Sequence, residues 1–165
     1  MGLRHRANRF RPAVDRSVVG CRFVTILGIG LDLVTISEFA EQLQRSGTTM
    51  LRESFTAGER RYCQSKQTDP ARSFAARWAA KEAVLKAWAS SRFARSPQIG
   101  DNPYPLIEVV NDAWGRPSIK LHGLAAEFLP RVRVHLSLTH DGDTAAAMVV
   151  LEDPGELADL IEGRH

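Results

Sequence analysis

Residues 69–89 read DPARSFAARWAAKEAVLKAWA, and this stretch predicts one long helix. Asp69 can cap the first turn and proline suits the first helical position, so the helix should begin at Pro70. At about 100° per residue, large apolar side chains and alanines fall on opposite faces. The two faces comprise Phe74, Trp78, Leu85 and Trp88 on one side, and Ala76, Ala79, Ala80, Ala83 and Ala87 on the other. Because a smooth alanine surface lets another backbone approach closely, we expect both sides of this helix to be covered.

Four charged side chains border the apolar face of this helix. Arg77 and Lys81 lie at one edge, and Glu82 and Lys86 lie at the other edge, one turn apart. An exposed Glu–Lys pair at this spacing is an ordinary surface ion pair worth about 0.3–0.5 kcal/mol. Buried charges are costly unless they are paired or hold a ligand. Because we expect the helix to be covered on both sides, we favour a ligand site at Glu82 and Lys86. An exposed ion pair between these two residues is the alternative.

An aspartate interrupts the most apolar stretch near the N-terminus. Residues 23–34, FVTILGIGLDLV, predict a buried strand that ends near Asp32. A carboxylate in this place needs a cation, a helix N-terminus or a row of backbone donors, and a capping or turn role is the alternative. Asp32 and Glu82 together offer two hard oxygen ligands from separate elements, which suits Mg²⁺. Lys86 beside them would neutralise the charge on a departing phosphate.

Two glycines before this aspartate resemble part of a dinucleotide-binding loop, but the pattern is incomplete. Gly28 and Gly30 are followed by Leu33 where the third glycine should stand, and Asp32 occupies the place where a phosphate-binding loop would turn. The sequence contains no Walker loop either. These observations argue against a Rossmann-type nucleotide site.

The rest of the chain alternates short helical and β-rich segments. The expected elements are a helix capped by Ser37 and running to Arg45, a short helix opened by a Thr56–Glu59 capping box, paired strands at 106–110 and 118–121, a helix at 123–129, and paired strands at 132–139 and 144–151. A long loop at residues 90–105 follows the long helix. This order predicts an α+β fold in which an antiparallel sheet of hairpins packs on the alanine-rich helix.

One strand of the second hairpin ends in a polar sequence, Ser137-Leu138-Thr139-His140. Strand alternation places Ser137 and Thr139 on the same face. His140 at the strand end would bond a phosphate or, as loop histidines more often do, a backbone group. No nucleophile elbow surrounds these residues, so they do not form a hydrolase pair.

The composition fits one soluble globular domain, with 165 residues of which 44% are hydrophobic and 25% charged. We expect a single domain at 23–152, a disordered basic extension at 1–22 and a C-terminal tail at 153–165. The net charge is +3, and the positive excess lies in the basic extension while the rest of the chain is close to neutral, so nothing in the domain itself favours a nucleic-acid partner. A chain of this length has little room for a deep private cleft, which favours a site shared between subunits.

Cysteine usage and hydropathy exclude further classes of protein. Cys21 and Cys63 show neither a CxxC motif nor metal-ligand spacing, so no disulfide framework or zinc site is indicated. Residues 24–33 are too short to span a membrane and contain Asp32, and they lack the pattern of a signal peptide. We therefore expect a cytoplasmic protein that has no membrane partner.

The motifs together resemble the holo-[acyl-carrier-protein] synthase type of 4′-phosphopantetheinyl transferase. The first motif is GIGLDLV at residues 28–34, and the second is FAARWAAKEAVLKA at residues 74–87. Supporting segments are FTAGE at 55–59, NDAWGRP at 111–117 and SLTH at 137–140, all in the order of the family. Each segment alone is a weak signal, but their joint occurrence is specific.

The resemblance implies transfer of 4′-phosphopantetheine from coenzyme A to a serine of an acyl carrier protein, with release of 3′,5′-ADP. It also implies a phosphopantetheinyl transferase fold and a homotrimer with active sites at the subunit interfaces. Asp32 and Glu82 would hold Mg²⁺, and Lys86 would stabilise or protonate the leaving phosphate. The residues expected near coenzyme A are Arg77, Lys81, Ser137, Thr139 and His140. The group that deprotonates the carrier serine stays open between Glu82 and a metal-bound water.

One position departs from the family pattern. Members often carry a basic residue on the first helix to meet an acidic carrier protein, whereas this chain has Glu38, and the nearest basic residue of that helix is Arg45. A carrier domain inside a type I fatty acid synthase, or a less acidic carrier, is therefore an open alternative. Two further hypotheses are a non-catalytic trimeric module that binds coenzyme A or nucleotide, and a nucleic-acid binder that acts through the basic extension.

Overall fold

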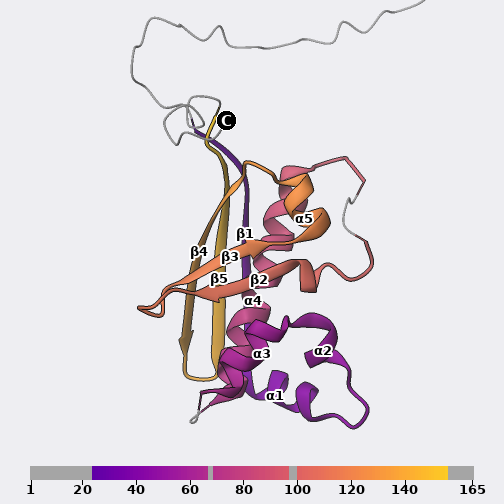
Figure 1. The fold of residues 1–165 in the computed structure, drawn as a ribbon, viewed down its shortest axis with the longest axis vertical. Helices are drawn as coiled ribbons and strands as arrows, with labels where there is room; N and C mark the ends of the chain where they lie inside the picture. Colours follow the sequence, from indigo (N-terminus) through magenta and orange to yellow (C-terminus); the bar gives the residue numbers. More distant parts are fainter. Residues whose placement is uncertain (1–23, 67–68, 97–99, 156–165) are drawn as a thin grey trace, which may run out of the picture.

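A computed structural model of the chain describes residues 24–66, 69–96 and 100–155 (Figure 1). Its helices are α1 (Ile36–Gln44), α2 (Met50–Ser54), α3 (Ala57–Gln64), α4 (Pro70–Ser91), the 3₁₀ turn η1 (Tyr104–Leu106) and α5 (Gly123–Phe128). Its strands are β1 (Thr25–Thr35), β2 (Ile107–Asn111), β3 (Pro117–Leu121), β4 (Arg133–Asp141) and β5 (Thr144–Asp153). Antiparallel sheets beside one long helix confirm the predicted α+β class. The predicted extension at 1–22 and most of the tail at 153–165 lie outside the described residues.

Helix α4 begins where the sequence predicts. The Asp69 carboxylate accepts a hydrogen bond from the Arg72 backbone N–H at 2.9 Å, and Pro70 is the first helical residue. The helix ends at Ser91, two residues beyond the expected end at Ala89. All of the alanines of the predicted alanine face are buried, which confirms that this face is covered.

Strand β1 is the element that covers the alanine face, and two glycines allow its close approach (Figure 1). A Cβ atom at Gly30 would lie 1.9 Å from the Ala83 carbonyl oxygen, and one at Gly28 would lie 2.0 Å from the Ala87 carbonyl oxygen. No real side chain fits at such distances. The glycines that resembled a nucleotide-binding loop are therefore a packing surface for α4.

Strand β1 forms one edge of a three-stranded antiparallel sheet of order β1-β5-β4. Asp32 pairs with Ala147 of β5 and lies inside β1, which continues to Thr35. The expectation that the strand ends near Asp32 is wrong, because the ladder with β5 continues for three more residue pairs. Strands β2 and β3 form a separate two-stranded sheet, so the hairpins do not share a single sheet.

The tip of the second hairpin caps helix α1. Strands β4 and β5 extend further than expected, so the turn consists of Gly142 and Asp143 instead of residues 140–143. The Asp143 carboxylate accepts from the Ser37 backbone N–H at 2.9 Å and from its hydroxyl at 2.5 Å. The prediction of Ser37 as N-cap is therefore wrong. Ser37 is the second residue of α1, and a carboxylate from a distant turn satisfies the helix end.

The two faces of the three-stranded sheet differ in exposure. Ala147, Val149 and Leu151 of β5 are buried in the core together with residues of α4. The opposite face leaves a row of large apolar side chains exposed, which are Ile29 (55%), Leu31 (56%), Leu33 (65%) and Met148 (45%). We call these four residues the apolar sheet face. Within the described residues, no helix has the length and apolar composition that a membrane span requires.

Candidate active site

A shallow hollow of about 280 Å³ collects the two predicted metal ligands. Strand β1 supplies Asp32, and helix α4 supplies Glu82. Helix α1 closes a further side with Glu38, Phe39 and Gln42. The structure thus brings together two carboxylates that are separated by 50 residues in the sequence, because β1 lies directly along α4.

Lys86 is paired with Asp32. Its Nζ donates to Asp32 Oδ1 at 2.7 Å and to the Leu31 carbonyl at 3.2 Å. The aspartate side chain is 13% exposed and the lysine side chain is 53% exposed. The hydrogen bond to Asp32 raises the pKa of Lys86, so the lysine keeps its charge at neutral pH. The cation joins helix α4 to strand β1 beside Asp32 and is more than the surface partner of Glu82 one turn away.

Glu82 receives its hydrogen bond from a residue outside the predicted site. The Tyr104 hydroxyl donates to Glu82 Oε1 at 2.7 Å. Burial and the contact with Glu82 raise the pKa of Tyr104 to about 12, so its hydroxyl stays protonated at neutral pH. In the described part of the chain, no donor contacts Oε2 of Glu82, which leaves this oxygen available.

The donor set of this hollow fits Mg²⁺. Among the described residues, no three His, Cys, Asp or Glu side chains are grouped so as to enclose a metal. Mg²⁺, however, usually binds one or two carboxylates and completes its shell with water and substrate phosphates. Asp32 and Glu82 in an open hollow are such a pair, with a cationic lysine beside them to balance phosphate charge.

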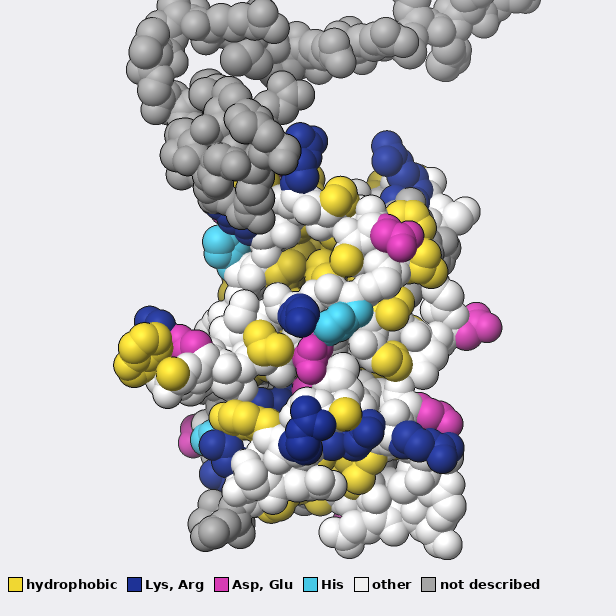
Figure 2. Space-filling view, in the orientation of Figure 1, with side chains coloured by type: hydrophobic (Ala, Val, Ile, Leu, Met, Phe, Trp, Pro, Cys, Tyr) yellow, Lys and Arg dark blue, Asp and Glu magenta, His cyan; other side chains and the backbone are white. Residues whose placement is uncertain are grey.

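A second hollow of about 370 Å³ collects three of the residues expected near coenzyme A, namely Arg77, Thr139 and His140. Tyr62 of α3 also lines it, and Figure 2 shows basic side chains gathered over the region of α3. The two hollows have no lining residue in common. Ser137 lies two positions before Thr139 on β4 and is exposed like it, but it lines neither hollow.

Arg77 is held rigidly at the floor of this second hollow. It is 4% exposed, and its terminal nitrogens donate to Asn111 Oδ1 at 2.6 Å and to the Ser73 carbonyl at 3.2 Å. Its guanidinium also lies 4.1 Å from the centroid of the Tyr62 ring. The buried Nε has no hydrogen-bond acceptor in the described structure. A fixed guanidinium on the lining of a hollow is suited to bind a phosphate.

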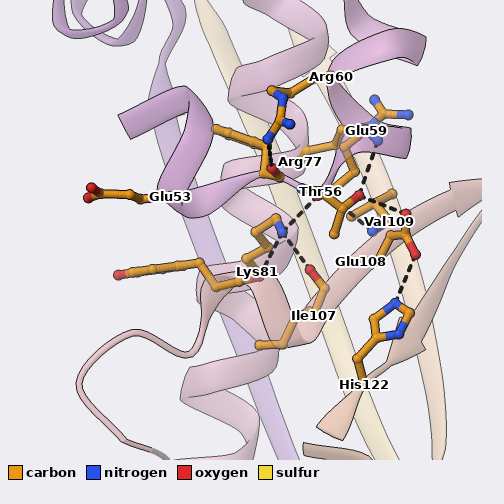
Figure 3. Close-up of polar contacts among 12 residues, drawn as sticks. Glu53, Thr56, Glu59, Arg60, Arg77, Lys81, Ile107, Glu108, Val109 and His122 are labelled. Atoms are coloured by element: carbon orange, nitrogen blue, oxygen red, sulfur yellow. Dashed lines mark hydrogen bonds and ion pairs between the residues drawn. The ribbon is translucent and has the colours of Figure 1, made fainter. Parts of the chain in front are cut away.

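Lys81 lies away from both hollows, in a buried network (Figure 3). The side chain has no exposed surface, and its Nζ forms an ion pair with Glu59 Oε2 at 2.9 Å. It also donates to the carbonyls of Tyr104 at 2.8 Å and Ile107 at 2.5 Å. Burial lowers the pKa of Lys81, and the charge of Glu59 opposes this effect. Lys81 does not line the hollow that collects Arg77, Thr139 and His140, and its buried contacts fit a structural role.

Replacing Lys81 with methionine should therefore destabilise the fold. The substitution leaves Glu59 as an uncompensated buried charge, and we expect a loss of about 3 kcal/mol in the free energy of unfolding. Urea denaturation measures this loss. The matched control is Lys120→Met on an exposed position of β3, which should change the free energy by less than about 0.5 kcal/mol. Unchanged stability of Lys81→Met, together with weaker coenzyme A binding, would contradict the structural role.

Two contacts made by residues of these hollows could not be predicted from the sequence. Tyr104 stands in a loop with no periodicity, so only the folded chain shows that it contacts Glu82. Asn111 belongs to a recognisable turn segment, but its contact with Arg77 joins residues 34 positions apart. Neither contact can be predicted from residue spacing, because each depends on how β2 and the preceding turn η1 pack on α4.

Comparisons with known proteins show the family of the chain. The family model described as the 4′-phosphopantetheinyl transferase superfamily matches residues 28–149. The chain is 96% identical over 142 residues to a holo-[acyl-carrier-protein] synthase of Nocardia farcinica, covering 86% of this chain and 98% of the relative. It is 54% identical over 129 residues to the holo-[acyl-carrier-protein] synthase of Mycobacterium tuberculosis, covering 78% of this chain and 98% of the relative.

Solved structures show the same similarity. The acyl carrier protein synthase of Mycobacterium tuberculosis superposes with a TM-score of 0.66 at 52% identity, covering 79% of this chain and all of the other. An ACPS–CoA complex from Chronobacterium ammoniagenes superposes with a TM-score of 0.70 at 38% identity, covering 78% of this chain and 96% of the other. The matched region includes both hollows described above.

Proposed function

Because the chain belongs to the 4′-phosphopantetheinyl transferase superfamily, as a holo-[acyl-carrier-protein] synthase, we propose that its reaction uses Mg²⁺ and releases 3′,5′-ADP. The substrate that carries the group is coenzyme A, and the acceptor is a serine of an apo acyl carrier protein. The observation that carries this proposal is the hollow in which Asp32 and Glu82 lie beside the cationic Lys86.

Asp32 and Glu82 would hold the metal against the pyrophosphate of coenzyme A. When bound, Mg²⁺ neutralises phosphate charge and orients the group that is transferred. The carrier serine attacks the phosphorus next to pantetheine, and the bond to the 3′,5′-ADP oxygen breaks. Lys86, held protonated by Asp32, stabilises the negative charge that develops on this oxygen or donates a proton to it. Glu82 is one candidate for accepting the proton of the serine.

The second hollow suits the nucleotide end of coenzyme A. Arg77 offers a fixed cation, and His140 and Thr139 line the same space. Phosphate groups are the ligands that such a set recognises. Ser137, on the same exposed side of β4, would lie at the margin of this site. Lys81 supports the site from the core and does not take part in this contact.

We propose that a homotrimer joins the two hollows at its subunit interfaces. We call the hollow with Asp32 and Glu82 the acidic hollow and the hollow with Arg77 the cationic hollow. Within one chain these two hollows share no lining residue, although the proposed reaction places one coenzyme A against both. The apolar sheet face of residues 29, 31, 33 and 148 is available to pack against another copy, since contiguous exposed apolar surface marks an interaction site. Packing through this face would place groups of neighbouring chains around one substrate.

The acceptor is an acyl carrier protein or a carrier domain of a type I fatty acid synthase, in the cytoplasm. Glu38 borders the acidic hollow and is exposed on α1, so this side of the site does not attract an acidic partner. A carrier whose contact surface is weakly acidic, or one that is tethered nearby, fits this surface best.

A transfer assay tests this function. Purified protein, coenzyme A, Mg²⁺ and an apo carrier protein should give a carrier whose intact mass increases by one phosphopantetheine, with an equal amount of 3′,5′-ADP. Chelation of the metal should stop both products, and added Mg²⁺ should restore them. Absence of the adduct with several carriers, or full turnover in the presence of the chelator, would contradict the proposal.

A further inference from the structure

Tyr104 contacts Glu82 from a separate segment of the chain. It is the first residue of η1, in the connection between α4 and β2, and its hydroxyl donates to Glu82 Oε1 at 2.7 Å. Its ring stacks on Trp78 of α4, with centroids 4.5 Å apart and planes inclined by 23°. Trp78 lies one helical turn before Glu82, so the ring and the hydroxyl of Tyr104 follow the same side of the helix.

Helix α4 also holds the backbone of Tyr104. Lys81 Nζ donates to the Tyr104 carbonyl at 2.8 Å, and the next residue, Glu82, accepts from the Tyr104 hydroxyl. Consecutive helical side chains diverge by about 100°, so residues 81 and 82 can reach two different ends of one tyrosine. Tyr104 is therefore fixed to α4 at its carbonyl, at its ring and at its hydroxyl.

The lysine that anchors Tyr104 is immobilised in turn (Figure 3). Lys81 and Glu59 have no exposed side-chain surface and form an ion pair at 2.9 Å. The other carboxylate oxygen of Glu59 accepts from the Val109 backbone N–H of β2 at 2.9 Å. A buried network whose members are all paired is rigid. The capping-box glutamate of α3 thus contributes to the position of η1.

We propose that Tyr104 is a positioning residue, which holds the Glu82 carboxylate in the orientation that binds the divalent cation. Its hydrogen bond occupies Oε1, while Oε2 has no donor in the described chain. Partners that orient a ligating carboxylate from behind raise the affinity of the site. This inference rests on the proposed function of Glu82 as a metal ligand.

The direct test is Mn²⁺ binding by electron paramagnetic resonance with coenzyme A present. Tyr104→Phe keeps the ring on Trp78 and the carbonyl on Lys81, and it removes only the hydroxyl. We expect its Mn²⁺ dissociation constant to rise by about tenfold or more. The control Ser91→Ala removes a hydroxyl that donates to the Trp88 carbonyl at the end of α4, and it should bind Mn²⁺ like wild type. Unchanged Mn²⁺ affinity in folded Tyr104→Phe would overturn the inference.

Variants of the ligands separate this inference from the proposed function. If Asp32→Asn and Glu82→Gln weaken Mn²⁺ binding and Tyr104→Phe does not, the positioning role alone is overturned. If neither ligand variant weakens Mn²⁺ binding, the proposed metal site is contradicted, and the positioning role of Tyr104 is contradicted with it. In a Glu82→Gln background, Tyr104→Phe should have almost no further effect, because the two changes remove one interaction. A further tenfold loss in that background would place the effect of Tyr104 elsewhere and overturn its action through Glu82.

Kinetics give a readout that a general loss of structure would not produce. High Mg²⁺ should restore the kcat of Tyr104→Phe toward wild type, and its KM for coenzyme A should stay unchanged. A kcat defect that does not respond to Mg²⁺ would contradict the positioning role.

Discussion

Replacing Asp32 with asparagine is expected to lower the kcat of phosphopantetheine transfer by about a thousandfold. Asparagine keeps the volume of the side chain and its place opposite Ala147 in the β1–β5 ladder, so the fold should remain intact. The substitution removes a charged ligand from the acidic hollow. It also replaces the charge-assisted hydrogen bond that raises the pKa of Lys86 with a weaker bond to an amide oxygen, so the charge opposite the leaving phosphate is held less firmly.

The measurement is the rate at which the intact mass of an apo carrier increases at saturating coenzyme A and Mg²⁺. Asp101→Asn, on an exposed loop, is the matched control and should retain the wild-type rate. Thermal unfolding of both variants should match wild type within the small range typical of surface changes. A folded Asp32→Asn protein with near wild-type kcat would show that the acidic hollow is not the site of transfer.

Replacing Gly30 with alanine should have the largest effect on stability. Its new Cβ would lie 1.9 Å from the Ala83 carbonyl oxygen and 2.6 Å from the Ala87 backbone nitrogen. Both atoms belong to the backbone of α4, so neither can rotate away, and β1 must separate from the helix. We expect a loss of about 5 kcal/mol, which is at the high end for a single substitution.

The matched control is Gly100→Ala, because a Cβ at Gly100 would meet nothing within 4 Å. It should change the midpoint of urea denaturation very little, whereas Gly30→Ala should shift it strongly or leave the chain unfolded. Equal midpoints for the two variants would contradict the close packing of β1 on α4.

The elements that could be predicted depend on local rules. The start of α4 follows from Asp69 and Pro70, and its two covered faces follow from the wheel of alanines and aromatic residues. Asp32 could be predicted as a site residue because a carboxylate within an apolar strand needs a partner or a ligand. Glu82 could be predicted because it is a charged residue on a helix that is covered on both sides. The hollow that brings them together agrees with this prediction, and their role as metal ligands remains a proposal.

The features that could not be predicted depend on contacts between distant segments. Ser37 is a suitable cap by type, but Asp143 satisfies the helix end from a hairpin 106 residues away. Lys81 and Glu82 both border the apolar face of the helix in the sequence. Only the folded structure shows that Lys81 is buried and paired with Glu59. The contacts of Tyr104 could not be predicted from the sequence, because its partners Glu82 and Trp78 lie on another element. Tertiary packing decided each of these cases.

In the proposed homotrimer, transfer takes place where the acidic hollow of one chain meets the cationic hollow of its neighbour. The most direct test mixes two inactive proteins, Asp32→Asn and the double variant Arg77→Gln, His140→Ala. They are unfolded and refolded together, and mixed assemblies are verified by native mass spectrometry. With random mixing in a closed ring, about a quarter of the sites contain two intact halves, so the carrier should gain phosphopantetheine at about a quarter of the wild-type rate. Mixed assemblies that remain as inactive as each parent would contradict the claim.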